Sequence, residues 1–225
     1  MLRADLHCHT CYSPDSTSAL KDIVRQCRKV GVDCLAVTDH NCLRGALELR
    51  EMAPFLVIPG EEIKSSEGEI IGLFLKEEVR PGLSPQETAG RIKEQGGLVY
   101  IPHPFSWRAS GLKTEALESI LPSVDIVEVF NARNNIFRGA NRKAEAFARE
   151  HSLPMAAGSD AHRLGELGRS GVIMPEFGGA EGFLRSIAQA TMVRAYSPVW
   201  VHFFSVGSRL LRRGRQRTMS HADST

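Results

Sequence analysis

Residues 34–40 read Cys-Leu-Ala-Val-Thr-Asp-His, a short apolar run that ends in an acid and a histidine. A run of this length and apolar character is typical of a strand that is buried on both faces of a parallel sheet. Helical patterns flank it over residues 18–30, where Gly31 follows, and over residues 44–52. The acid and the histidine are therefore predicted to lie where a buried strand ends.

The same alternation of strand-like runs and helical patterns continues along the chain, and it is typical of repeated βα units in a parallel sheet or barrel. The other predicted strands are residues 2–7, 55–59, 98–102, 125–130 and 155–157, with a hairpin or pair of strand segments over 62–64 and 69–75. The other predicted helices run from Ser84-Pro85 to Gly96-Gly97 and over residues 113–121, 137–151 and 180–190. We predict one α/β domain over residues 1–197 and a separate tail over residues 198–225.

The composition is that of an ordinary globular domain, with 42% hydrophobic and 24% charged residues in a chain of 225. The net charge of +2 is too small to indicate the basic face that nucleic-acid binding requires, so we expect no nucleic-acid partner. We find no signal-peptide pattern and no apolar stretch that is long enough to span a membrane, which favours a cytoplasmic protein. The five cysteines are odd in number and favour reduced thiols. Cys8 and Cys11 have C-x-x-C spacing, but the motif ends a strand instead of opening a helix, which disfavours a redox role.

Polar side chains of metal-binding types cluster just after the predicted strands. They are His7, His9, Asp39, His40, Glu61, Glu62, His103, Glu128, Asn131, Asp160 and His162. Because the carboxyl ends of all strands in a β/α barrel converge on one face, these residues are predicted to share a metal site. The alternatives are that strand-end histidines are merely satisfied polar residues and that Asp39 or Asp160 caps the following helix. Within the first motif, His7 and His9 face one side of an extended segment, so Cys8 is expected to be packed on the other side.

Together the segments D-L-H-C-H-T, T-D-H, G-E-E-I, I-P-H-P, E-V-F-N and G-S-D-A-H resemble the PHP family, named for polymerase and histidinol phosphatase domains. The resemblance covers roughly residues 3–197 and is closest to the short stand-alone metal-dependent phosphoesterases. It implies a distorted (β/α)7 TIM-like barrel with two or three metal ions at the carboxyl ends of the strands.

The resemblance also implies a ligand set for each ion. The first ion would be held by His7, His9, Glu62 and Asp160, and the second by Asp15, His40 and His162. A third ion would share Glu62 and be held by His103, with Glu69 in a place where the family often has a histidine. Because imidazoles and carboxylates are mixed and no thiolate takes part, the expected metals are Mn²⁺, Fe²⁺ or Zn²⁺.

These residue types suit hydrolysis of a phosphate ester, either a phosphomonoester or a nucleotide phosphodiester in a small phosphorylated substrate. Two cations about 3.5 to 4 Å apart can lower the pKa of a bridging water and neutralise phosphoryl charge. We expect His40 and Asp160 to be catalytic through the metals, and Arg133 to contact the phosphoryl oxygens, with Arg163 as second candidate. Both arginines can also be solvated loop residues. The alternative function is a metal-binding regulatory or structural module without turnover.

The tail from Pro198 onward is basic. It carries +4, and the remainder of the chain carries −2, because the tail holds one acid, Asp223, and five arginines, Arg209, Arg212, Arg213, Arg215 and Arg217. Read as a helix, it places Val199, Phe203, Val206 and Leu210 on one apolar stripe. The first interpretation is that this stripe packs against the barrel and that the residues from about Gly214 are disordered. The second is that a basic amphipathic segment rests on an anionic membrane surface or a partner.

Overall fold

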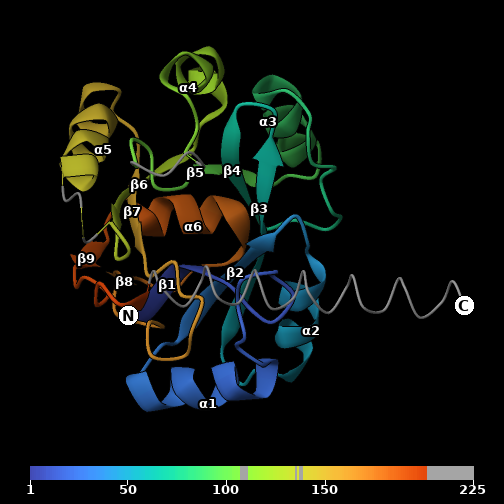
Figure 1. The fold of residues 1–225 in the computed structure, drawn as a ribbon, viewed down its shortest axis with the longest axis vertical. Helices are drawn as coiled ribbons and strands as arrows, with labels where there is room; N and C mark the ends of the chain where they lie inside the picture. The colour runs from blue at the N-terminus through green and yellow to red at the C-terminus, as the bar shows by residue number, and fades with distance from the viewer. Residues whose placement is uncertain (107–110, 135, 137–138, 202–225) are drawn as a thin grey trace, which may run out of the picture.

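The computed structural model describes residues 1–106, 111–134, 136 and 139–201, and within them the strands form one curved sheet (Figure 1). The strand order is β7-β6-β5-β4-β3-β2-β1-β8-β9. The strands are β1 (Leu2–Cys8), β2 (Cys34–His40), β3 (Leu56–Ser65), β4 (Gly68–Leu73), β5 (Leu98–Ile101), β6 (Ile126–Asn131), β7 (Met155–Gly158), β8 (Gly171–Met174) and β9 (Thr191–Val193).

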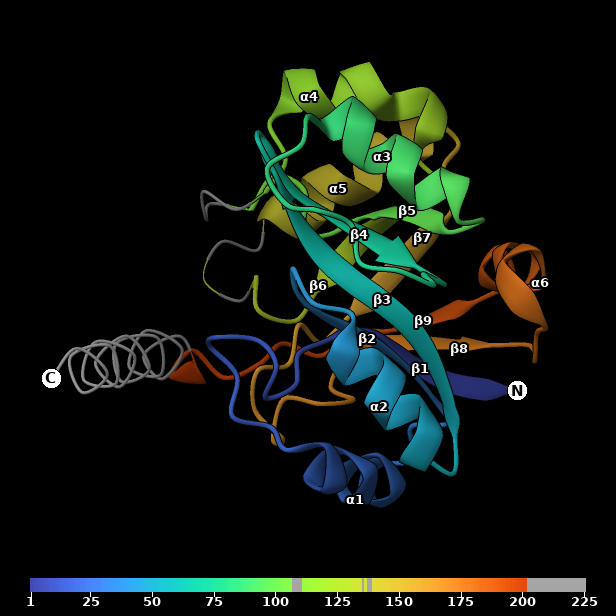
Figure 2. The same ribbon diagram turned by 90° about the vertical axis from the view of Figure 1, so that its right-hand side faces the viewer.

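Helices cover both faces of this sheet, as the two ribbon views show (Figures 1 and 2). They are α1 (Leu20–Val30), α2 (Arg44–Met52), α3 (Pro85–Glu94), α4 (Thr114–Ile120), α5 (Gly139–Glu150) and α6 (Gly179–Ile187), with a 3₁₀ turn over Leu121–Ser123. Helices α1 to α5 share one hydrophobic core with the outer face of the sheet. Helix α6 packs Phe183 and Ile187 into a second core, which is lined by the inner face of strands β1 to β8. The inner core therefore lies inside the curve of the sheet.

The sheet closes into a nearly complete barrel because β7 returns to lie beside β1. The backbone N–H of Asp160 donates to the carbonyl of His7 at 2.8 Å, and Cys8 and Ala161 form a parallel bridge. This seam confirms the predicted α/β barrel. The prediction of a parallel sheet is only partly right, because β3–β4, β4–β5, β1–β8 and β8–β9 are antiparallel pairs.

The differences from the predicted strands have local causes. Residues 55–59 and 62–64 were expected to be separate segments, but β3 is continuous, because its second half pairs with both β2 and β4. A turn at Ser66 and Glu67 joins β3 directly to β4, and a connection this short permits only antiparallel pairing. The short strands β8 and β9 were not predicted, since four and three residues leave too little pattern to detect.

Helix boundaries follow the predicted capping residues in two places and depart from them in one. Ser84 forms a full capping box with Glu87 at the start of α3, and Gly31 ends α1 in the left-handed conformation at φ 68°. The helix predicted to begin at Ser18 begins at Leu20 instead. Ser18 is drawn toward the barrel mouth, where its hydroxyl donates to the carbonyl of His162 at 3.4 Å.

A β-bulge in the first strand decides which side chains face the barrel interior. The register between β1 and β2 shifts by one residue between Asp5 and Cys8. Leu6 therefore lies in the inner core, whereas Cys8 lies in the outer core and is 1% exposed. This placement agrees with the expectation that Cys8 is packed, and it leaves His7 to point across the mouth of the barrel.

The start of the tail lies against the barrel as far as it is described. Val201 is buried, whereas Val199 is 53% exposed, so the predicted apolar stripe is not uniformly packed at its beginning. The remaining stripe residues Phe203, Val206 and Leu210, and all the tail arginines, lie outside the described residues. In the part of the chain that is described, no helix has the length and apolarity needed to cross a membrane.

Candidate metal centre

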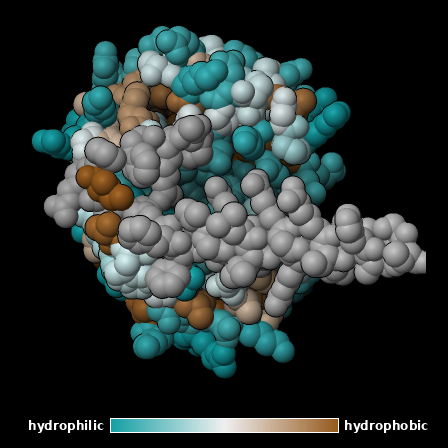
Figure 3. Space-filling model, viewed as in Figure 1, coloured by the Kyte–Doolittle hydropathy of each residue, from teal (hydrophilic) through white to brown (hydrophobic). Residues whose placement is uncertain are grey.

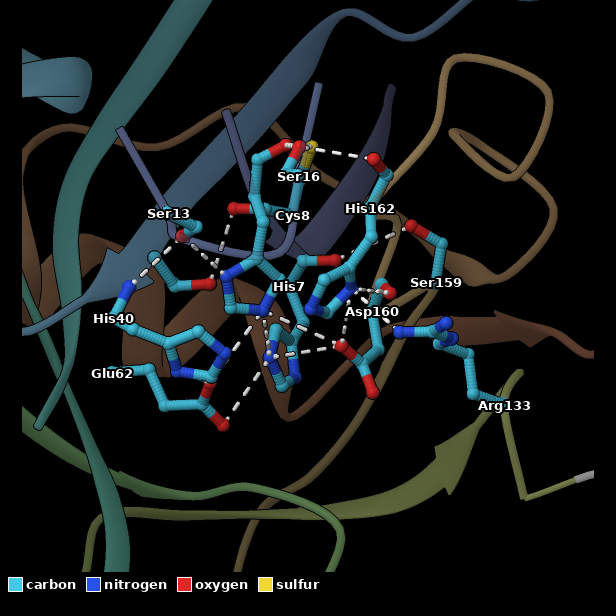
Figure 4. A network of polar contacts seen from close by, with 12 residues as sticks. His7, Cys8, Ser13, Ser16, His40, Glu62, Arg133, Ser159, Asp160 and His162 are labelled. Atoms are coloured by element: carbon cyan, nitrogen blue, oxygen red, sulfur yellow. Dashed lines mark hydrogen bonds and ion pairs between the residues drawn. The ribbon is translucent and has the colours of Figure 1, made fainter. Parts of the chain in front are cut away.

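The carboxyl ends of the strands bring histidines and carboxylates into one buried cluster (Figure 4). Every residue predicted to bind metal lies in this region: His7, His9, Asp15, His40, Glu62, Glu69, His103, Asp160 and His162. Apart from His40, whose side chain is 15% exposed, and Glu69, at 12%, each of these side chains is at least nine-tenths buried. The convergence of strand ends predicted from the sequence is thus present, and metal binding by these residues stays a prediction.

Glu62 lies at the centre of the cluster. It is the register partner of His40 across strands β2 and β3, which sets the two side chains next to each other. One carboxylate oxygen lies 2.9 Å from His40 Nδ1, and the other lies 2.9 Å from His103 Nε2. The same oxygens are 3.5 Å from the Nε2 atoms of His9 and His7. Its neighbour Glu61 points away from the cluster, toward the backbone of Val79.

His7 and His9 face each other with their Nε2 atoms 3.2 Å apart. The Nδ1 atom of His7 lies 3.1 Å from a carboxylate oxygen of Glu128, and that of His9 lies 3.0 Å from Ser13 Oγ. Where Nδ1 of each ring donates its proton to that oxygen, both Nε2 atoms present lone pairs to the same point. Two facing lone pairs repel unless a cation lies between them. This arrangement fits a metal ion held by imidazole nitrogen.

A second group of donors surrounds Asp15, whose carboxylate oxygens lie 3.3 Å from His162 Nε2 and 3.6 Å from His40 Nε2. Ring nitrogens of His9, His40 and His162 all lie within 4.8 Å of one another. Asp160 connects this group with the first, because its Oδ1 atom is 3.4 Å from both His9 Nε2 and His162 Nδ1. Imidazoles and carboxylates at these separations suit two neighbouring divalent cations.

The donors predicted for a third ion are also close together. His7, Glu62 and His103 form one group of three, and His40, Glu62 and Glu69 form another. Glu69 lies farther from its neighbours than Glu62 does, at 3.8 Å from His103 Nε2 and 3.9 Å from His40 Nδ1. Glu69 therefore stands at the outer edge of the cluster.

The electrostatics of the cluster favour ionised carboxylates and a neutral His162. Burial alone would raise the pKa of Asp160, but His7, His9 and His162 hold it well below its usual range. The pKa of His162 is lowered to about 4 by burial and by the neighbouring His9 and Arg133. For His103, burial opposes the charged form, but Glu62 raises its pKa to about 8. Neutral imidazole and ionised carboxylate are the forms that bind metal ions, so a bound ion would have to displace the proton that Glu62 favours on His103.

Two buried acids, Glu128 and Glu166, form hydrogen bonds and ion pairs with residues of the cluster. Glu128 accepts hydrogen bonds from Tyr100 Oη at 3.2 Å, His103 N at 2.7 Å and Asn131 Nδ2 at 2.9 Å, in addition to its contact with His7. Glu166 lies 3.2 Å from Arg133 Nε. A carboxylate with this many donors fixes the orientation of the rings and loops that it touches.

The predicted arginines differ in their placement. Arg133 is buried, and its Nη1 atom lies 2.7 Å from His162 Nδ1, which brings the guanidinium to the edge of the cluster (Figure 4). Arg163 is half-buried, and its backbone N–H donates to Glu166 at 3.1 Å. The interpretation of Arg133 as a solvated loop residue is therefore wrong. The capping interpretation of Asp39 is also wrong, because Asp39 binds Thr10 and Ser13, and α2 has no side-chain cap.

Two residues of the cluster lie in strained backbone. His103 and Asp160 have φ values of 30° and 53°, in the left-handed region that non-glycine residues rarely adopt. Such strain persists only where surrounding contacts overdetermine it, and it gathers at functional sites. Here the contacts are the bond from His103 N to Glu128 and the bond from Asp160 N to His7.

Comparison with known proteins agrees with this geometry. A family model described as the PHP domain matches residues 5–64, and a second model, described as PHP-associated, matches residues 138–192. An uncharacterized protein of Methanocaldococcus jannaschii is 43% identical over 144 residues, which are 58% of this chain and 82% of that protein. The chain belongs to the PHP family.

Solved structures of distant relatives share the fold. A two-domain protein of Bacteroides vulgatus, described as containing a predicted PHP-like metal-dependent phosphoesterase, aligns with a TM-score of 0.68 and 18% identity. The alignment covers 86% of this chain and 65% of that protein, so this chain spans less than two thirds of its length. PsfC of Pseudomonas syringae aligns with a TM-score of 0.66 and 17% identity, over 95% of this chain and 99% of its own.

Proposed function

We propose that this protein hydrolyses a phosphate ester whose phosphoryl group lies at the end of a small molecule. The observation that carries the proposal is the placement of Glu62, which touches four imidazoles that belong to adjoining groups of donors. A carboxylate in this position can be shared by neighbouring cations. Membership of the PHP family and the likeness to a PHP-like metal-dependent phosphoesterase support the same chemistry.

The depth of the cluster supports a terminal phosphoryl group. The outermost side chains, His40 and Glu69, are only 15% and 12% exposed, and the others lie deeper. An internal phosphodiester carries a bulky group on each side, whereas a monoester or a terminal diester can enter end-on. A phosphomonoester is therefore the first substrate class to test, and a nucleotide phosphodiester is the second.

In this proposal the chain holds the cations and orients the substrate. His7, His9, Glu62 and Asp160 would hold one ion, and Asp15, His40 and His162 would hold another. Bound divalent cations supply an activated water and neutralise phosphoryl charge. We propose Mn²⁺, Fe²⁺ or Zn²⁺, since the donors are imidazole and carboxylate.

Arg133 is proposed to steady the phosphoryl oxygens. Glu166 pairs with Nε of its guanidinium, and Nη1 lies beside His162. These two contacts fix the position of the guanidinium. A guanidinium held in this way donates parallel hydrogen bonds to an oxyanion more strongly than a neutral donor does. Burial of the site excludes water and strengthens these charge interactions.

The test is hydrolysis of a panel of phosphomonoesters and phosphodiesters by the Mn²⁺-loaded protein. We expect His40→Ala and Asp160→Ala to abolish turnover of an aryl phosphate and to lower the bound metal, with the fold retained. His151→Ala is the matched control, because His151 lies at the end of α5 and contacts only the Phe147 ring among the described rings. Full metal content in the wild type without turnover on any ester would favour the alternative, a metal-binding module. Unchanged turnover in both site variants would contradict the proposed site.

A further inference from the structure

A hydrogen-bond relay runs from His9 to the buried carboxylate of Asp39, which is not among the proposed metal-binding residues. Ser13 Oγ lies 3.0 Å from His9 Nδ1 and 2.6 Å from Asp39 Oδ1. The backbone N–H of His40 donates to the same hydroxyl oxygen at 3.1 Å, a contact that is visible in Figure 4. His9, Ser13 and Asp39 are all fully buried, so water does not compete for these bonds.

The direction of each hydrogen bond in this relay follows from the donors available. Asp39 accepts from the backbone N–H of Thr10 at 2.7 Å and from the Thr10 hydroxyl at 2.7 Å. An ionised carboxylate only accepts, so the single proton of Ser13 is directed to Asp39. The backbone N–H of His40 can only donate, and it occupies one lone pair of the Ser13 oxygen. The Ser13 oxygen can accept a second hydrogen bond, and His9 Nδ1 lies 3.0 Å from it, so a proton on His9 Nδ1 completes the relay.

We infer that Ser13 and Asp39 are positioning residues that hold His9 as its Nδ1–H tautomer, with the Nε2 lone pair turned toward a cation. The inference rests on the proposed metal site. The Nε2 atom in question is the one that lies 3.2 Å from His7 Nε2 and 3.4 Å from Asp160 Oδ1. The hydrogen bond on one ring nitrogen sets which form the other nitrogen takes, and it fixes the plane of the ring.

The two histidines of the H-x-H pair are thereby oriented by different strands. Glu128, on β6, contacts His7 Nδ1 directly, whereas Asp39, on β2, acts on His9 through the hydroxyl of Ser13. The Ser13 hydroxyl also accepts a hydrogen bond from the backbone N–H of His40, so the same relay holds the backbone of His40 in place. Asp39 therefore acts on ligands from both proposed metal positions.

Helix α2 leaves space for this relay. A Cβ atom placed on Gly45, in the first turn of the helix, would collide with Asp39 Oδ2 and would lie 2.7 Å from Thr10 Oγ1. Any larger side chain would therefore displace the Asp39 carboxylate or the Thr10 hydroxyl. The lack of a side chain at Gly45 allows the carboxylate to lie against the backbone of α2.

The first measurement is nitrogen NMR of the histidine rings in metal-free wild-type protein. The ring nitrogen shifts and their proton couplings report directly which nitrogen of His9 is protonated. We expect protonation on Nδ1 with Nε2 bare. Protonation of His9 on Nε2 would overturn the inference without any variant being made.

The second measurement compares Ser13→Ala with Ser16→Ala. Ser16 is a buried serine of the same loop, but its hydroxyl contacts backbone, with the carbonyl oxygens of His9 and His162 at 3.1 and 3.0 Å and Ser18 N at 3.3 Å. In metal-free Ser13→Ala we expect a mixture of His9 tautomers, and in competition with a chelating dye we expect about 10- to 100-fold weaker Zn²⁺ binding. Ser16→Ala should retain the wild-type tautomer.

An unchanged His9 tautomer in Ser13→Ala, or an equal shift in Ser16→Ala, would show that the relay does not set the tautomer. If Ser13→Ala does not fold, the ring-nitrogen measurement on the wild type still tests the inference, because it needs no variant. Neither readout uses a phosphate ester. A protein with the expected tautomer and no hydrolytic activity would therefore contradict the proposed function alone.

Discussion

Replacing Glu61 by glutamine is expected to remove a pH dependence of folding stability that this buried carboxyl group creates. Glu61 alternates with Glu62 on β3 and points to the opposite side, where it is fully buried and accepts one hydrogen bond from Val79 N at 2.9 Å. Its other oxygen has no hydrogen-bond partner among the described residues. Burial raises the pKa of Glu61 from 4.5 to about 7, against the effect of the Val79 bond.

The sign and size of the effect follow from linkage. Because the folded-state pKa is raised, the protonated group favours the folded state, and this stability is lost as the pH rises through about 7. A shift from 4.5 to about 7 corresponds to a loss of about 2 to 3 kcal/mol between pH 5 and pH 8. Glutamine does not titrate, so the free energy of unfolding of Glu61→Gln relative to wild type should rise by this amount over the same range.

The assay is urea unfolding of metal-free wild type and Glu61→Gln at intervals from pH 5 to pH 8. Glu77→Gln is the control, since Glu77 is an exposed acid of the loop that covers Glu61. The difference between wild type and Glu77→Gln should stay constant with pH. A wild-type minus Glu61→Gln difference that is equally flat would refute the reasoning, because it would mean that Glu61 is ionised at little cost.

Three further predictions concern the metal centre. A Cβ on Gly158 would lie 2.5 Å from His7 Cβ and from Glu128 Oε1, so Gly158→Ala should lose about 1 to 3 kcal/mol in urea unfolding and bind less metal. Gly165→Ala, where nothing lies within 4 Å, should do neither, and equal behaviour of the two would contradict the packing argument. Arg133→Lys keeps the positive charge but removes the planar guanidinium and its parallel N–H donors, so inhibition by inorganic phosphate should weaken about tenfold at unchanged metal content. Undiminished inhibition would exclude a contact between Arg133 and the phosphoryl group. Removal of metal with a chelator should lower the Tm, and Mn²⁺ should restore it, because the ion binds the folded state only; a Tm that is independent of metal would contradict binding.

The location of the site could be predicted from the sequence because it depends on short-range pattern. Asp39 and His40 follow one apolar run, and Asp160 and His162 follow another, so each pair marks the end of a strand. The carboxyl ends of the strands converge in this class of fold. The role of Asp39 could not be predicted in the same way. Its partners Thr10 and Ser13 lie in an irregular loop, and no periodicity records where the hydroxyl of such a loop points.

Other features depended on contacts between distant parts of the chain. Glu166 lies in a loop with no regular element, and its contact with Arg133 is made only when the loops after β6 and β7 meet. The bulge between Asp5 and Cys8 is a property of the pairing of β1 with β2, so strict alternation along one strand does not reveal it. Strands β8 and β9 form by pairing with each other at the edge of the sheet, and segments of four and three residues are too short to show a strand pattern in the sequence.

Because the proposed metal-binding residues lie on both sides of the seam between β1 and β7, metal binding is linked to closure of the barrel. His7 and Asp160 face each other across the seam; His7 lies in the first strand of the chain, and Asp160 directly follows the seventh. No fragment that lacks either strand can bring these donors together, so a bound ion would signal that the barrel has closed. Its binding energy would be added at a contact between residues far apart along the chain, where the entropy cost of closure is large. Loss of the ion is accordingly expected to open the barrel along this seam before any single helix unfolds.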